Sequence, residues 1–251
     1  MIRPLQAIRA TVPAMALVVL VSGPARAQVP DKFDNLQIFP KDIGKQELIH
    51  VMRQFSDALG VSCNFCHLER VPGDRNTTDW ASDDKEHKVI ARGMMKMVGN
   101  INAELLPAAT GEHDFQVQCV TCHRGLTNPS TLEQVMLRVT DKDGIDAAVT
   151  KYRELRERYY GAGSYDFGSE SLGKVAETLA QEKGDLAGAL RVVDLNVEVH
   201  PEDADAYVMR GQIQFASGDK EGAVASAMRA LELDPENRDA KRMVDQMSGG
   251  K

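Results

Sequence analysis

All four cysteines of this 251-residue chain lie in two copies of the pattern Cys-x-x-Cys-His. Residues 63–67 read CNFCH, and residues 119–123 read CVTCH. Two intervening residues place both sulfurs on one edge of a single helical turn, so each thiol can add to a haem vinyl group as a thioether. The adjacent histidine can then bind the iron. The sequence therefore predicts two covalently bound haems c, with Cys63, Cys66, Cys119 and Cys122 as attachment sites and His67 and His123 as proximal ligands.

Cysteine pairs at this spacing can also form a redox-active dithiol, and two such pairs can bind a tetrahedral zinc ion. Neither role needs a histidine after the second cysteine, yet a histidine follows both pairs. Residues 67–118 separate the pairs, a gap of 52 residues, whereas zinc ribbons use roughly 15 to 20. The spacing and the repeated histidine favour haem over both alternatives.

Residues 1–27 have the composition of a secretory signal peptide. Arg3 and Arg9 make the start basic, residues 11–23 are mostly apolar, and residues 25–27 (ARA) supply the small residues of a cleavage site. The apolar run is shorter than the ~20 residues of a membrane-spanning helix and is interrupted by Pro13, so no stable membrane anchor is expected. Thioether attachment of haem c takes place outside the bacterial cytoplasm, and the expected location is the periplasm.

The chain carries a formal charge of −7, and loss of the basic signal peptide would make it more negative. An acidic protein is repelled by nucleic acid and by anionic membrane surfaces, so neither is an expected partner. The charge instead favours a redox partner protein with a basic docking face, and a membrane-bound redox complex is compatible with it.

Helical periodicity on either side of the first motif predicts which side chains could face a haem. A helix is expected from about Lys45 to Leu59, ending at Gly60. Its apolar stripe comprises Leu48, Met52, Phe55 and Leu59, and His50 lies on the opposite side. Met52 is therefore the candidate distal ligand on this helix.

Residues 68–82 are polar and are expected to form a surface loop before a second helix from about Asp83 to Leu106. The stripe of the second helix comprises Ile90, Met94, Met97, Ile101 and Leu105. Met95 lies off this stripe, and His87 is a weaker candidate at its edge. Periodicity leaves Met94 and Met97 as alternative ligands.

Three segments resemble the cytochrome subunit of the photosynthetic reaction centres of purple bacteria and its soluble relatives: LIHVMRQFSDALGVSCNFCH (48–67), VIARGMMKMVGNIN (89–102) and VTCHRG (120–125). The resemblance covers about residues 35–128, one half of the family's four-haem arrangement. It implies a helical dihaem domain in which Met52 and Met94 are the distal ligands. The loop before Cys119 is about three residues longer than the family's, and Ala108 stands where a family histidine reaches a further haem.

A 34-residue repeat follows this region. Gly184-Asp185 recurs as Gly218-Asp219, and Pro201 recurs as Pro235. This is the period of tetratricopeptide repeats, which are pairs of packed helices. The sequence thus predicts an all-α protein with a signal peptide (1–27), a dihaem cytochrome domain (28–128), a connecting segment with a helix near Ile145–Tyr160 (129–168) and tetratricopeptide-type repeats (169–251).

His/Met ligation would leave neither iron open to a substrate, which favours an electron carrier over an enzyme. The repeats would then dock a redox partner or cap the haem domain. The alternative is a dihaem enzyme such as a peroxidase, which needs one displaceable distal ligand. A repeat scaffold with structural haems is a third hypothesis, in which rapid reversible reduction would be missing.

Overall fold

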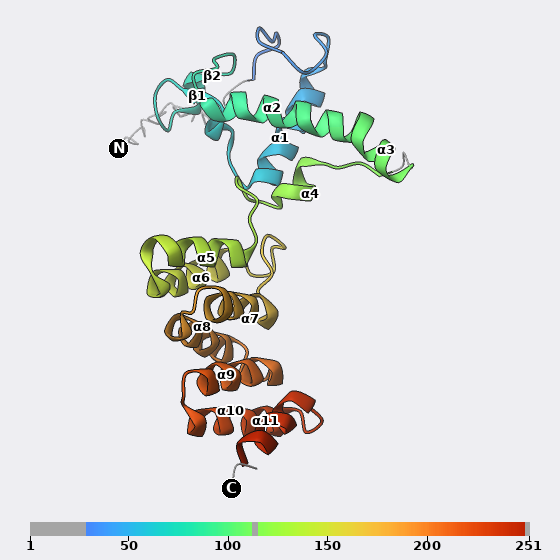
Figure 1. The fold of residues 1–251 in the computed structure, drawn as a ribbon. Helices are drawn as coiled ribbons and strands as arrows, with labels where there is room; N and C mark the ends of the chain where they lie inside the picture. Colours follow the sequence, from blue (N-terminus) through green and yellow to red (C-terminus); the bar gives the residue numbers. More distant parts are fainter. Residues whose placement is uncertain (1–28, 112–114, 249–251) are drawn as a thin grey trace, which may run out of the picture. The chain divides into compact units, whose positions relative to one another are not determined.

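A computed structural model describes residues 29–111 and 115–248 (Figure 1). The predicted signal peptide lies outside the described residues. Apart from one two-stranded ladder, the regular elements of the described residues are helices, and the predicted all-α class is confirmed. The chain divides into two units: the first contains residues 29–45 and Cys63–Met97, and the second contains Gln46–Ser62 and residues 98–248.

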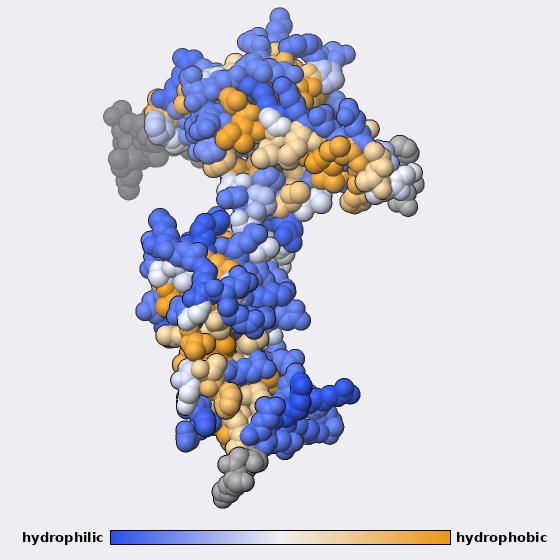
Figure 2. Space-filling model, viewed as in Figure 1, coloured by the Kyte–Doolittle hydropathy of each residue, from blue (hydrophilic) through white to orange (hydrophobic). Residues whose placement is uncertain are grey.

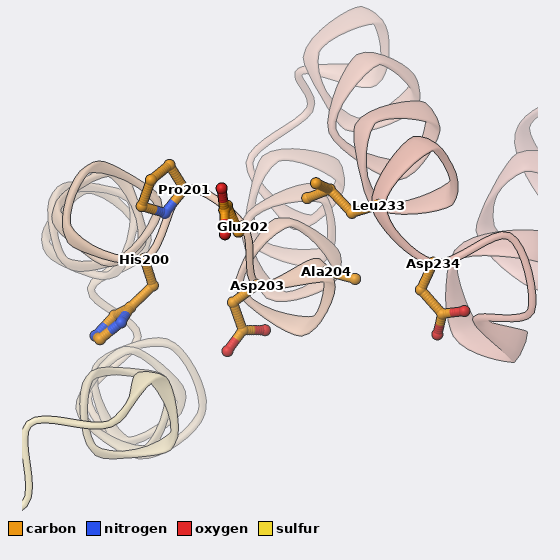
Figure 3. A pocket seen from close by; sticks show the side chains of 7 residues that line it. All are labelled: His200, Pro201, Glu202, Asp203, Ala204, Leu233 and Asp234. Carbon is orange, nitrogen blue, oxygen red and sulfur yellow. The ribbon is translucent and has the colours of Figure 1, made fainter.

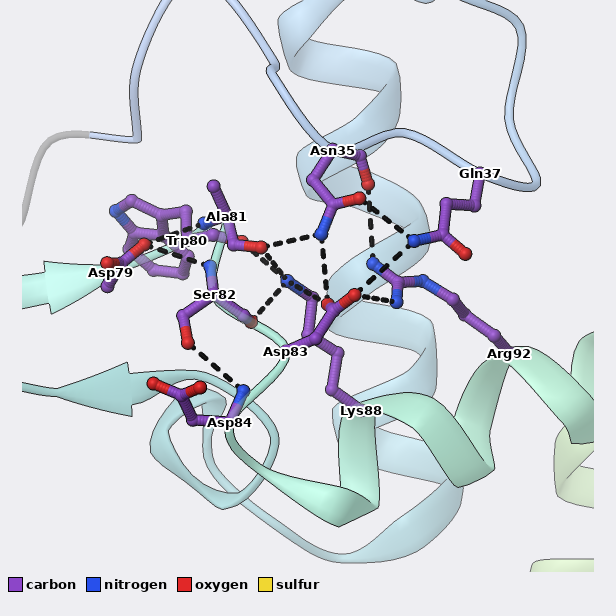
Figure 4. A network of polar contacts seen from close by, with 10 residues as sticks. All are labelled: Asn35, Gln37, Asp79, Trp80, Ala81, Ser82, Asp83, Asp84, Lys88 and Arg92. Carbon is purple, nitrogen blue, oxygen red and sulfur yellow. Dashed lines mark hydrogen bonds and ion pairs between the residues drawn. The ribbon is translucent and has the colours of Figure 1, made fainter.

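The first unit is organised by a polar network around Asp83 (Figure 4). The Asp83 carboxylate accepts a hydrogen bond from Asn35 at 3.0 Å and forms an ion pair with Arg92 at 2.8 Å. These contacts, Arg92 first, hold the pKa of Asp83 well below its usual range. Lys88 donates to the carbonyls of Trp80, Ala81 and Ser82. The network ties the extended N-terminal lead and the 80–82 segment to one helix.

Residues 68–82 differ from the plain loop that composition predicts. Strand β1 (Leu68–Glu69) pairs antiparallel with β2 (Thr78–Asp79), and the turn between them contains a short 3-10 helix, Arg75–Thr77. Arg70 and Asp79 form an ion pair at 2.7 Å across this hairpin. A ladder of two residues has no apolar alternation to reveal it, which explains why the sequence does not predict it.

Helix α1 (Lys45–Leu59) has the predicted bounds. Leu48 and Ala58 are buried and Met52 and Phe55 are half-buried, whereas His50 is exposed, as the apolar stripe predicts. The helix ends at Gly60, whose φ of +66° is a left-handed conformation suited to glycine. A side chain at Gly60 could not fit, because its Cβ would lie 2.3 Å from the Gly125 carbonyl oxygen.

Helix α2 (Glu86–Asn100) continues through a π-helical turn, Ile101–Leu105, into the short α3 (Leu106–Thr110). The predicted helix thus exists, but it begins and ends a few residues later than expected. Gly111, with φ of +69°, terminates it.

The larger core of the second unit lies among the helices from residue 132 onward. Helix α5 (Leu132–Asp143) pairs with α6 (Ile145–Tyr159), and α7 (Ser169–Glu177) with its π-helical extension, Thr178–Glu182, pairs with α8 (Leu186–Val199). Fully buried side chains from these helices form one cluster that includes Met136, Tyr152, Leu172, Leu179 and Val192. The predicted helix near Ile145–Tyr160 is confirmed, whereas α5 has no counterpart in the prediction.

Helices α9 (Ala204–Ala216), α10 (Lys220–Leu233) and α11 (Arg238–Ser248) continue the series. The recurring Gly-Asp pair makes the same turn twice: Gly184 and Gly218 have φ of +67° and +91°. Asp185 and Asp219 then cap α8 and α10 by accepting from the Gly188 and Gly222 amides. The 34-residue repeat therefore corresponds to a repeated helix–turn–helix unit. Among the described residues, no helix is both long and apolar enough to cross a membrane.

Candidate functional site: two haem-attachment motifs

The first motif forms one tight turn in the first unit. Cys63–Phe65 is a 3-10 turn, and the His67 amide donates to the Cys63 carbonyl at 2.9 Å. Cys63 is exposed, Cys66 is half-buried, and both thiols are free. Burial raises the pKa of the Cys66 thiol, and nearby Lys85 partly opposes this. Two unpaired thiols on one turn, one of them open to solvent, match the requirement for a double thioether link.

His67 lies deeper than the thiols. Burial, followed by the charge of Lys88, lowers the pKa of His67 to about 4. The imidazole is therefore neutral at physiological pH, which is the form that binds a metal. Its ring lies against Trp80, the single tryptophan of the chain, with the ring centroids 4.9 Å apart. Buried His67 Nδ1 makes no hydrogen bond of normal geometry with the described residues.

The second motif is a single helical turn, α4 (Cys119–His123), in the second unit. Its start is capped by Thr121 Oγ1, which accepts from the Gln118 amide at 3.0 Å. Its end is set by Arg124, whose φ of +47° is a left-handed conformation that non-glycine residues seldom adopt. Cys119 is half-buried, Cys122 is exposed, and both thiols are free.

His123 has its Nδ1 2.8 Å from the Leu126 carbonyl oxygen. A carbonyl oxygen can only accept, so Nδ1 carries the proton and the lone pair of Nε2 remains free. Iron-ligating histidines are oriented by this kind of hydrogen bond, which also makes the ring a stronger donor to the metal. The geometry of His123 thus fits a proximal haem ligand.

Three further contacts fix the backbone around the second motif. Asn102 exchanges two hydrogen bonds of 2.8 Å with the Val117 backbone, which anchors the segment before Cys119. The Gly125 amide donates to the Ala58 carbonyl at 2.8 Å. Buried Ser164 donates to the Arg124 carbonyl at 2.6 Å and so holds the unusual conformation that follows His123. Sequence reasoning did not identify these supporting residues, because each acts on a segment distant in sequence.

The candidate methionines lie on helices α1 and α2. Met52 is half-buried on α1. Met94 and Met97 are 42% and 49% exposed, whereas Met95 is half-buried. This confirms that Met95 faces another direction, and it leaves Met94 and Met97 on the same uncovered face. His87, the weaker candidate, stacks on Phe65 of the first motif with the ring centroids 4.1 Å apart.

Met52 and the first motif belong to different units, as do Met94 and the second motif. Their pairing as axial ligands stays a prediction. The structure brings together Cys63, Cys66 and His67 in one turn, and it does the same for Cys119, Cys122 and His123.

The apolar stripe of α2 offers a test of whether this part of the chain suits a haem. Ile90, Met97 and Leu105 are 48%, 49% and 61% exposed, and apolar residues gather on the surface over α2 in Figure 2. Of the described residues before 127, the buried apolar side chains are Leu48, Ala58 and Leu126. A helix with an uncovered apolar stripe, in a region with so few buried side chains, needs an apolar partner. A porphyrin face is such a partner, and the residues fit the group.

The repeats contain a shallow depression lined by His200, Pro201, Glu202, Asp203, Ala204, Leu233 and Asp234 (Figure 3). Two of its acidic side chains, Asp203 and Asp234, accept hydrogen bonds from nearby backbone amides. Asp203 accepts from the Asp205 and Ala206 amides at the start of α9. Asp203 therefore caps a helix start, and no chemistry is assigned to it.

Residues 74–158 match the family of the photosynthetic reaction centre cytochrome C subunit, and residues 204–237 match the tetratricopeptide repeat. The first match contains the second motif and extends through α5 and α6. Cytochrome c-554 of Chloroflexus aurantiacus is 33% identical over 102 residues, 37% of this chain and 23% of that protein.

Two proteins called photosynthetic reaction center cytochrome c subunit are also similar. That of Thermochromatium tepidum is 34% identical over 108 residues, 41% of this chain and 22% of the relative. That of Roseobacter denitrificans is 31% identical over 104 residues, 41% of this chain and 26% of the relative. The chain thus spans about a quarter of the length of these relatives. The resemblance inferred from the haem motifs, and the tetratricopeptide repeat that follows them, are both confirmed.

Proposed function

We propose that this chain is a periplasmic dihaem c-type cytochrome that carries electrons between redox partners. The observation that carries the proposal is the pair of Cys-x-x-Cys-His turns. Each presents two free thiols beside a histidine suited to bind iron. The resemblance to reaction centre cytochrome subunits and the uncovered apolar stripe of α2 support it.

Each haem, when bound, supplies a one-electron ferrous/ferric couple. Cys63 and Cys66 would hold the first haem covalently, and Cys119 and Cys122 the second. His67 and His123 would each bind an iron through Nε2, and Met52 and Met94 would complete the two ligand sets. Such ligand sets would leave no position for a substrate, and the chain's residues would hold, orient and shield the haems.

The partners are proposed to be redox proteins with basic docking faces, because the chain is acidic. The repeats are suited to dock such a partner, since stacked helix pairs expose a broad surface on a packed core. A membrane-bound redox complex fits the same description. Periplasmic location is part of the proposal and rests on the composition of residues 1–27.

The decisive experiment is the haem count of periplasmic protein. Intact mass should exceed that of the processed chain by two haems, and haem stain should survive a denaturing gel. Cleavage at the predicted signal site should appear in the same spectrum. One haem, or none, would exclude the dihaem proposal.

Optical spectra then separate the carrier from the enzyme. A wholly low-spin spectrum with the thioether-to-iron charge-transfer band is expected for two His/Met haems. A high-spin component, or a rapid reaction with peroxide, would favour the dihaem enzyme.

A further inference from the structure

The two histidines differ in the environment of the ring nitrogen that points away from the iron. His123 Nδ1 donates to the Leu126 carbonyl at 2.8 Å, whereas buried His67 Nδ1 makes no hydrogen bond of normal geometry with the described residues. The Trp80 backbone interacts with the His67 ring and partly opposes the lowering of its pKa. A histidine whose Nδ1–H is hydrogen-bonded donates more strongly and stabilises the ferric state. His123 has this bond at a normal length, and His67 Nδ1 does not.

Two cations also lie close to the first motif and are mostly shielded from water. The Lys88 and Arg92 side chains are only 12% and 14% exposed. Lys88 Nζ lies 2.9, 3.0 and 2.7 Å from the carbonyl oxygens of Trp80, Ala81 and Ser82. Since Trp80 packs on the ring of His67, this ammonium is held near the iron ligand by the residue that contacts it.

The negative charge of Asp83 is shared between two cations. Asp83 lies 3.3 Å from Lys88 and 2.8 Å from Arg92, so one carboxylate faces two cations (Figure 4). Lys85 adds a third positive charge and donates to the Asn64 carbonyl within the first motif. Asp79 also acts on Lys88. The charged groups that act on the His67 ring are nevertheless all cations, with Lys88 first, followed by Arg92 and Lys85. Next to the second motif, by contrast, Arg124 is exposed, and solvent screens its charge.

A fixed positive charge in a poorly solvated region disfavours ferric iron more than ferrous iron, because the ferric centre carries one more positive charge. We propose that Lys88, held by the 80–82 carbonyls, raises the reduction potential of the haem at Cys63–His67 above that of the haem at Cys119–His123. Lys88 is an electrostatic residue in this account and touches no reacting atom. With both haems bound, the first would be the better electron acceptor and the second the better electron donor. The inference rests on the proposed function and adds the direction of electron transfer between the two haems.

Spectroelectrochemical titration of the full holoprotein tests this directly. Wild-type protein should show two reversible one-electron potentials. Lys88→Met should shift the ferric/ferrous equilibrium of the higher-potential haem about threefold to tenfold toward ferric, a drop of about 30–59 mV, and spare the other. Lys88→Arg keeps the charge and should keep both potentials. Lys96→Met, which removes an exposed cation from the same helix, is the matched control and should change neither.

Three results would overturn the inference: no shift in Lys88→Met, a shift of the lower potential, or equal shifts in Lys88→Met and Lys88→Arg. The last would mean that packing matters and charge does not. If Lys88→Met fails to fold, Lys85→Met removes a second positive charge near His67 at a more accessible position. This variant should lower the higher potential by a smaller amount. An unchanged higher potential in Lys85→Met would contradict the inference. Haems that cannot be reversibly reduced would instead contradict the proposed function.

Discussion

Loss of the haems should unfold the region around them and leave the repeats folded. The variant that tests this replaces all four cysteines by alanine, which abolishes covalent attachment at both motifs. Before residue 127, the described buried apolar side chains are Leu48, Ala58 and Leu126, far fewer than the cluster among α5 to α8. The haem region has little protein-made core to keep it folded.

The size of the effect follows from the α2 stripe. Ile90, Met94, Met97 and Leu105 are between 42% and 61% exposed. Complete burial of such a side chain is worth about 1.5–3 kcal/mol, so covering the exposed half of each gains about 1 kcal/mol, or about 4 kcal/mol together. Domains are stable by only about 5–15 kcal/mol. A region with three buried apolar side chains among its described residues should lie at the low end of that range, where a loss of this size removes most of the stability.

Limited proteolysis with mass spectrometry, alongside circular dichroism, measures the outcome. The four-alanine variant should be cut rapidly within about residues 35–111, while a fragment beginning near Leu132 resists digestion. The repeats act as an internal control in the same sample, because their core contains no haem contact by this reasoning. Unchanged yield, helicity and cleavage in the variant would show that the reasoning is wrong and that the protein makes its own core there.

The remaining predictions concern single positions. Met52→His and Met94→His should each keep the affected iron low-spin but lower its reduction potential substantially in a redox titration, since axial ligands set haem potentials over a range of about 0.8 V. Met97→Leu should leave both potentials unchanged. If the potential of the second haem changes in Met97→Leu and not in Met94→His, Met97 is the ligand. Gly60→Ala should destabilise the protein in a denaturant titration by more than Gly73→Ala. Both glycines have positive φ, a conformation that costs a residue with a side chain roughly 1–2 kcal/mol. Of the two, only Gly60 would place an added Cβ against a carbonyl oxygen, at 2.3 Å. Equal losses of unfolding free energy in the two variants would contradict this prediction. Asp83→Asn should lower the melting temperature at pH 7. Because contacts depress the pKa of Asp83, its stabilisation is complete above about pH 4 and is lost only as the pH falls through the depressed value. The difference in melting temperature between Asp83→Asn and the wild type should therefore be smaller at pH 3 than at pH 7.

The sequence predicts well those features that depend on local periodicity. The bounds of α1 match because an apolar stripe and a terminal glycine specify them within one segment. Helix α5 was missed although it carries a local signal. Thr131 and Gln134 form a capping box, in which each side chain accepts from the other residue's amide. Charged residues dilute the apolar stripe of α5, so periodicity alone does not reveal it.

Sequence periodicity does not predict features that depend on contacts between different segments of the chain. Asn35 and Asp83 lie 48 residues apart, and their hydrogen bond has no periodic signal. Lys88 lies on a helix rich in charge, where a solvated position is the ordinary expectation. Its three carbonyl contacts become visible only when the hairpin and α2 are placed together in the first unit. The same reason hides Ser164 from sequence analysis.

Ser164 joins the second motif to the best-packed part of the chain. It lies among aromatic residues that contact one another: Tyr159 with Tyr165 at 5.5 Å, and Tyr152 with Phe167 at 5.8 Å between ring centroids. Tyr152 and Phe167 belong to the core shared by α5 to α8. The segment that holds the Arg124 carbonyl is therefore anchored next to this core. Since Arg124 follows His123 directly, the orientation of the second proximal ligand depends on the packing of the helices that are proposed to dock a partner.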